Sequence, residues 1–152
     1  MTDNNAAPAR SNIGTDISLI GDSHIAKYRE TNGETGYLWN GATALLLTTK
    51  GRKSGEARTI AIIFKQVGDR YAIIASKGGA PDHPAWYLNA VNDPHVTLQI
   101  KGEIFDGIAR TAEGAEREEL WAASLEQWPN YDVYQSRTDR KIPVLVVERV
   151  KN

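Results

Sequence analysis

The chain has 152 residues, a formal net charge of −1, 41% hydrophobic and 24% charged residues, and no cysteine. This length suits one domain that can bury roughly 70% of its unfolded surface, and the composition argues against disorder as the main state. The lack of cysteine excludes disulfides, thiolate metal sites and a cysteine nucleophile, and it is typical of a reducing compartment. The near-neutral charge argues against a nucleic-acid binder. Without a long apolar run or a signal-peptide pattern, we expect a cytoplasmic protein.

The first part of the chain predicts an arm, one helix and three strands. Residues 1–22 are polar and small and predict a flexible N-terminal arm, so that 23–152 form the folded domain. Ser23 would cap a short helix that stops near Gly33. Apolar runs rich in β-branched residues, joined by turns that contain glycine, predict three antiparallel strands at 42–49, 57–67 and 70–76.

The second part predicts helices inserted between further strands. Pro84 begins a helix over 84–93, and Thr111 caps another over 112–128 that Pro129 ends. One face of that second helix is apolar through Leu120, Trp121, Leu125 and Trp128. The remaining strands are expected at 95–100, 103–110 and 142–150. This order predicts an α+β single-domain barrel of about six mainly antiparallel strands, and it does not fit an alternating parallel sheet.

Familiar catalytic motifs are missing from the chain. The three histidines have no metal-ligand spacing, so no metal site is predicted, and we interpret His83 as a surface residue or a contact at the start of a helix. The sequence also lacks the nucleophile elbow, the phosphate-binding P-loop and the dinucleotide-binding glycine pattern. A Rossmann-type cofactor site is therefore not indicated.

Two loops next to strands combine cations with glycines. The stretch KGRKSGEAR at 50–58 places four cations and one acid between two apolar strands, where glycines let backbone amides approach a ligand. Arginine and lysine there would hold a phosphate or carboxylate, although a solvated hairpin turn has a similar composition. The stretch SKGGA at 76–80 follows a strand directly, a position that holds either a ligand or an ordinary connector.

A third stretch, WPNYDVY at 128–134, spaces three aromatic residues at intervals of three. That spacing places them on one face of a helical turn. They would either line an apolar pocket with phenol groups as donors or pack in the core.

Three longer segments together carry a family resemblance: LLLTTKGRKSGEAR at 45–58, SKGGAPDHPAWYLN at 76–89 and YDVYQSRTDRKIPV at 131–144. Through them the chain, from about 43 to 147, resembles the deazaflavin-dependent nitroreductase family. Members of that family use reduced coenzyme F-420 and adopt a flavin-type split β-barrel. The resemblance implies an oxidoreductase that transfers a hydride from the deazaflavin to an electron-poor quinone, activated alkene or nitroaromatic.

The resemblance also implies which residues bind the cofactor. Its acidic tail is assigned to Arg52, Lys53, Ser54 and Arg58. The deazaflavin ring and its side chain are assigned to Ala75, Ser76, Lys77, Gly78 and Gly79. Further residues are expected along the cofactor: Pro84, Ala85, Trp86, Tyr87 and Asn89.

The same resemblance assigns the catalytic and substrate-facing residues. Tyr131 matches a tyrosine beside both cofactor and substrate, Tyr134 matches a second pocket tyrosine, and Ser76 would hydrogen-bond the ring edge. Trp128 completes the expected substrate pocket, but nitroimidazole-reducing relatives can carry a tyrosine there, so the activation of nitroimidazoles is in question.

The resemblance also leaves alternative functions open and bears on the partners of the chain. A flavin mononucleotide enzyme and a non-catalytic deazaflavin carrier remain as other readings of the fold. We expect a monomer or a homodimer without a transmembrane segment. Apolar residues near the N-terminus would either contact a membrane peripherally or, as we favour, pack on the barrel: Ile25, Tyr28, Tyr37, Leu38 and Trp39.

Overall fold

The computed structural model describes residues 20–151, so most of the expected arm at 1–22 lies outside the described residues. The helices are α1 (Asp22–Thr31), the short 3-10 helix η2 (Lys77–Gly79), α2 (Ala85–Asn92), α3 (Gly114–Gln127) and α4 (Asn130–Ser136). The strands are β1 (Leu38–Trp39), β2 (Ala42–Lys50), β3 (Ala57–Ile63), β4 (Lys65–Val67), β5 (Arg70–Ile74), β6 (His95–Ile100), β7 (Glu103–Thr111) and β8 (Val144–Arg149).

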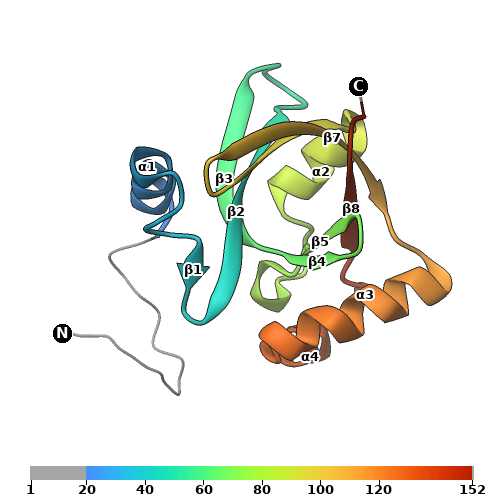
Figure 1. Cartoon of the computed structure of the whole chain (residues 1–152). Helices are drawn as coiled ribbons and strands as arrows, with labels where there is room; N and C mark the ends of the chain where they lie inside the picture. Colours follow the sequence, from blue (N-terminus) through green and yellow to red (C-terminus); the bar gives the residue numbers. More distant parts are fainter. Residues whose placement is uncertain (1–19, 152) are drawn as a thin grey trace.

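The strands form one antiparallel sheet that curls into a barrel (Figure 1). Its order is β1-β2-β6-β7-β8-β5-β4, and β3 pairs with β2 away from that path. Because β3 and β4 follow each other in the chain, this segment joins β2 at one end of the path to β5 at the other. The expected α+β split barrel is thereby confirmed.

The bend between β3 and β4 corrects the prediction of one strand over 57–67. Phe64 separates the two strands, and its buried ring packs in the core. The Phe64 carbonyl accepts hydrogen bonds from the Thr43 hydroxyl at 2.9 Å and from the Gln127 amide at 2.8 Å. The Phe64 amide still donates to the Thr43 carbonyl at 3.0 Å, so side chains replace the ladder only at the Phe64 carbonyl, where the segment turns from β2 toward β5.

Alternation along the strands builds two separate cores. On β8, Leu145 and Val147 face the barrel interior, whereas Val144 and Val146 pack with α3 and α4 on the outer side. Figure 1 shows α3 and α4 together on one side of the barrel. The predicted apolar face of α3 is confirmed, since Leu120 is fully buried there.

Two predicted helix starts are wrong. Thr111 is the last residue of β7, and its hydroxyl bonds to the Tyr87 hydroxyl at 2.7 Å, so α3 begins only after Glu113. Gly21, not Ser23, precedes the first residue of α1, while the Ser23 hydroxyl donates back to the Ile20 carbonyl. The predicted stop is confirmed, because α1 ends at a left-handed Asn32.

The N-terminal apolar segment packs largely on the barrel. Tyr28 is fully buried, and its hydroxyl donates to the Ala44 carbonyl at 3.0 Å. Tyr37 packs against the interior core, and the Trp39 ring stacks on Trp128 with centroids 6.1 Å apart. Leu38 is 67% exposed. Within residues 20–151, none of the helices has the length and apolar character that crossing a membrane requires.

Candidate functional site

The turn between β2 and β3 is a tight, glycine-dependent hairpin. The Gly51 amide donates to the Glu56 carbonyl and the Gly55 amide to the Gly51 carbonyl, both at 2.8 Å. Gly55 has φ +78°, which favours glycine. A Cβ on Gly51 would lie 2.8 Å from the Ser54 hydroxyl oxygen, so that glycine lets Ser54 fold inward. The turn thus exposes its cations while its backbone is fixed.

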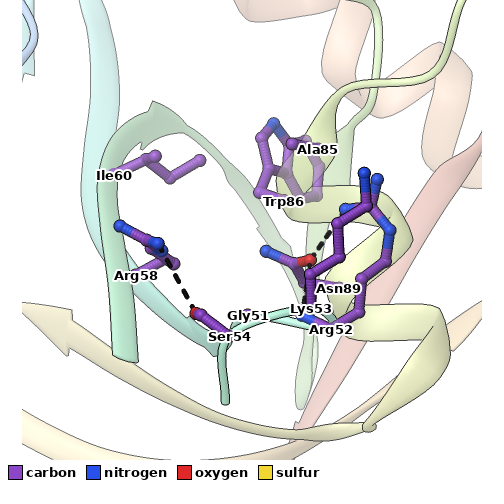
Figure 2. A pocket seen from close by; sticks show the side chains of 9 residues that line it. All are labelled: Gly51, Arg52, Lys53, Ser54, Arg58, Ile60, Ala85, Trp86 and Asn89. Carbon is purple, nitrogen blue, oxygen red and sulfur yellow. Dashed lines mark hydrogen bonds between the residues drawn. The ribbon is translucent and has the colours of Figure 1, made fainter. Parts of the chain in front are cut away.

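This turn forms one wall of a cavity of about 350 Å³, with α2 as the opposite wall. Figure 2 shows Ile60 and Arg58 of β3 facing Ala85, Trp86 and Asn89 of α2 across the opening. The volume lies in the range of small-molecule sites. The complete lining is Gly51, Arg52, Lys53, Ser54, Arg58, Ile60, Ala85, Trp86 and Asn89.

A buried amide connects the two walls. The Asn89 side chain is 6% exposed, and its Oδ1 accepts from the Arg52 amide at 3.2 Å and from Arg52 Nη1 at 3.0 Å. The backbone amide and the guanidinium of Arg52 are therefore both bonded to Asn89 on α2. Figure 2 marks hydrogen bonding between these two residues with a dashed line. Asn89 orients a cation, in addition to lining the cavity.

The chemistry of the cavity is cationic at the rim and partly apolar inside. Arg52, Lys53 and Arg58 are exposed. Arg58 donates to the Ser54 hydroxyl oxygen at 3.5 Å, and its nearest carboxylate, that of Glu56, lies 4.0 Å away. The Ser54 hydroxyl oxygen accepts from the Glu56 amide at 3.1 Å, which leaves its own proton for a ligand. Forked guanidinium donors and a lysine suit phosphate and carboxylate groups. The residues present thus fit the acidic part of an elongated anionic cofactor.

The loop after β5 has an unusual backbone. Lys77, Gly78 and Gly79 have φ values of +48°, +64° and +86°, so three successive residues are left-handed. Gly79 lies directly against α4, because a Cβ on it would be 2.5 Å from the Tyr134 carbonyl oxygen. Ser76 is half-buried and Lys77 exposed. The predicted ring-binding loop and the helix with the predicted tyrosines are therefore in contact.

The two tyrosines of α4 differ in environment. Tyr131 is 5% exposed, its ring packs against Trp121 and Tyr134, and burial raises the pKa of its phenol. The Tyr134 hydroxyl accepts from the Trp128 indole at 3.4 Å. Because the Tyr134 oxygen only accepts in this contact, its O–H group is left to donate to a ligand.

The structure groups the predicted residues into two places. The hairpin cations and Ala85, Trp86 and Asn89 surround the cavity, while the 76–79 loop meets α4. Tyr87 lies in the interior core with its hydroxyl bonded to Thr111, Ala75 is fully buried, and Pro84 is buried at the start of α2.

Sequence reasoning did not assign two residues, Ile60 and Arg140, to these places, and it did not predict the contact between Trp39 and Trp128. Ile60 lines the cavity, and its position two residues after Arg58 on one strand face was the available signal. Trp39 stacks on Trp128, and Arg140 contacts the 76–80 loop. No local pattern marks either of these long-range contacts.

The fold and the cavity together define a small split-barrel protein with a cation-lined cavity between the hairpin and α2, and with a glycine loop that packs on a tyrosine-bearing helix. The family model described as F420H(2)-dependent quinone reductase matches residues 22–149, and the chain belongs to this family. An F420H(2)-dependent quinone reductase of Mycobacterium tuberculosis (strain ATCC 25618 / H37Rv) is 40% identical over 130 residues, which cover 83% of this chain and 87% of the relative.

Solved structures agree with this assignment. An F420-H2 dependent reductase, FDR-A, is 43% identical with a TM-score of 0.65, and the match covers 69% of this chain and 93% of that one. A structure described as a domain-swapped dimer has the same identity and TM-score, with 79% of its chain covered. The expected deazaflavin-dependent reductase family is thus confirmed.

Proposed function

We propose that this protein transfers a hydride from reduced coenzyme F-420 to a quinone. The observation that carries the proposal is the cavity between the hairpin and α2, where Arg52, Lys53 and Arg58 surround a partly apolar interior. Quinone is preferred among the electron-poor acceptors because the family and its relatives are named as quinone reductases.

The cavity residues would bind the acidic tail of the cofactor. Arg52 is held by Asn89 before any ligand arrives, so less side-chain entropy is lost when it meets an anion. Lys53 and Arg58 add charge, and the Ser54 hydroxyl adds a neutral donor. Because these cations are exposed, we expect the affinity for the tail to fall as salt rises.

The loop and the helix would act at the reacting end. When bound, reduced coenzyme F-420 supplies the hydride, and the protein positions the reactants and handles the proton. Ser76 and the neighbouring loop amides would donate hydrogen bonds to the ring edge, where charge changes during transfer. Tyr131 and Tyr134 line the same region through the contact between Gly79 and α4.

A proton must accompany the hydride, because a quinone becomes a hydroquinone by taking up one hydride and one proton. The Tyr134 oxygen accepts from the Trp128 indole, so its O–H group is not used in that bond and can point at the acceptor. The raised pKa of Tyr131 keeps that phenol protonated as well. Either phenol would donate a proton to the acceptor oxygen as negative charge develops there.

Titration of the purified chain with oxidised coenzyme F-420 and with flavin mononucleotide tests the cofactor. We expect tight, salt-sensitive binding of the deazaflavin and weak binding of the flavin. Loss of the reduced form is then followed with quinones, enones and nitroaromatics. Preference for the flavin would support a flavin enzyme, and tight deazaflavin binding without turnover would support a carrier.

A charge-reversal pair tests the tail site. Arg52→Glu with Lys53→Glu should weaken deazaflavin binding by several kcal/mol, given roughly 1.5–3 kcal/mol for each hydrogen bond to a charged group. Lys27→Glu with Lys151→Glu gives the same change in net charge on exposed residues elsewhere. If both double variants bind equally well, the tail does not occupy this cavity.

We also propose a cytoplasmic protein that is a monomer or a homodimer. The lack of cysteine supports a reducing compartment, and one similar structure is described as a domain-swapped dimer. The packing of Tyr28, Tyr37 and Trp39 on the barrel favours the reading without membrane contact. Sedimentation and liposome flotation of the full chain measure both properties.

A further inference from the structure

Arg140 connects the segment after α4 to the loop after β5. Its Nε donates to the Ala80 carbonyl at 2.8 Å, its Nη2 to the Ser76 carbonyl at 2.8 Å, and its Nη1 to the Ala75 carbonyl at 3.3 Å. Nη1 also donates to His83 Nδ1 at 2.9 Å. One guanidinium thus binds three carbonyls of a single loop and a side chain at its end.

Hydrogen bonds from neighbouring residues also hold the main chain of Arg140. The Gln135 side chain on α4 donates to the Arg140 carbonyl at 2.8 Å, and the Arg140 amide donates to the Thr138 hydroxyl at 3.3 Å. His83 Nδ1 accepts from the guanidinium, so this imidazole is neutral. Burial, and to a lesser extent the charge of Arg140, lowers the pKa of His83. Hydrogen bonds therefore hold both the main chain of Arg140 and its guanidinium.

Together with the Gly79 amide, which donates to the Ser76 carbonyl at 2.9 Å, the bonds of Arg140 set the direction of two peptide groups. In a planar trans peptide the carbonyl and the following amide N–H point in opposite directions, and no cis peptide occurs within the described residues. Drawing the Ala75 and Ser76 carbonyls toward Arg140 therefore turns the N–H groups of Ser76 and Lys77 away from it. Lys77, whose amide belongs to the second of these peptides, has the left-handed φ of +48°.

We propose that Arg140 is a positioning residue, which presents the amide N–H groups of Ser76 and Lys77 to the ring of the bound deazaflavin. This inference rests on the proposed function. The inference goes beyond the proposed function, because it assigns the alignment of the ring-edge donors to a side chain more than sixty residues away in sequence. A lysine cannot replace the guanidinium, because its single nitrogen lacks the planar fork that serves three carbonyls.

Arg140→Lys tests the proposal against Arg70→Lys, a matched structural control. Arg70 also makes two short bonds, to Glu116 and Glu119 at 3.0 Å, but on the outer side of the barrel. We expect kcat with a quinone to fall about 10- to 100-fold in Arg140→Lys, somewhat below the effect of deleting a preorganised donor. KM for the quinone should stay within about threefold, as for an effect on the reacting end alone.

Chemical rescue separates positioning from folding. Methylguanidinium should restore part of kcat in Arg140→Ala and leave Arg70→Ala unchanged. If Arg140→Lys keeps the kcat of Arg70→Lys, or rescue fails in folded Arg140→Ala, the inference is wrong. Should both Arg140 variants fail to fold, the wild-type amide resonances decide it. The Ser76 and Lys77 amides must shift on addition of oxidised coenzyme F-420, and unmoved resonances would overturn the inference.

The proposed function has its own failure, which is distinguishable. A wild-type chain that neither binds oxidised coenzyme F-420 nor turns over with the reduced form contradicts that function. If the wild-type chain does both and Arg140→Lys keeps the kcat of Arg70→Lys, only the role of Arg140 is contradicted.

Discussion

The contact between Gly79 and α4 predicts a large difference between two neighbouring glycines. Both Gly78 and Gly79 are left-handed, with φ +64° and +86°. A Cβ on Gly78 would meet nothing within 4 Å, whereas one on Gly79 would lie 2.5 Å from the Tyr134 carbonyl oxygen and 3.0 Å from the Arg137 Cβ. The pair of alanine substitutions therefore isolates the packing of this loop against the helix.

The magnitudes follow from these geometries. An alanine in a left-handed conformation costs roughly 1–2 kcal/mol, which is the whole effect expected for Gly78→Ala. Gly79→Ala adds the displacement of backbone and Cβ atoms of α4, and overpacking of this kind costs roughly 1–3 kcal/mol. We therefore expect Gly79→Ala to lower the free energy of unfolding by about 2–5 kcal/mol.

Urea unfolding followed by tryptophan fluorescence measures both values, and the slope with denaturant shows whether the transition stays two-state. Turnover should follow the same order, because displacement of α4 moves Tyr134. Equal destabilisation by the two substitutions would refute the contact, since only the conformational cost would remain.

Two further predictions concern single side chains. Arg110 and Arg70 lower the pKa of Glu116 from 4.5 to about 2, so its stabilisation is present above pH 4.5 and is lost as the pH falls toward 2. The shift corresponds to at most about 3.4 kcal/mol, and to about 1–2 kcal/mol after solvent screening. Glu116→Gln should lower the free energy of unfolding by this amount at pH 7 but not at pH 2. An unchanged pH dependence in denaturant titrations would contradict it. Tyr131→Phe removes a hydroxyl without a hydrogen-bond partner in residues 20–151, so the free energy of unfolding should change by less than about 1 kcal/mol. We expect kcat to fall at least about tenfold. Turnover at the wild-type rate would rule out Tyr131 as the proton donor.

The parts of the fold that the sequence predicts are those in which the signal is local. The hairpin over 50–58 carries its own glycines and cations between two apolar strands, and the cavity forms where that hairpin meets α2. The last strand was likewise predicted from a local apolar run, and that strand is buried on both faces. Helix boundaries were less predictable, because Thr111 bonds to Tyr87 instead of capping α3.

The parts that escaped prediction depend on partners far away in the chain. The bend at Phe64 needs the side chain of Gln127, and the course of the 75–80 loop needs Arg140. Both devices use a side chain to satisfy a carbonyl that regular structure leaves open, and neither has a periodic pattern. The two ends of the proposed cofactor site therefore differ in origin. The tail end is built from adjacent residues, whereas the reacting end exists only once α4 and the segment behind it have packed against the barrel. Mutations on the outer side of α4 should accordingly disturb turnover before they disturb binding of the tail.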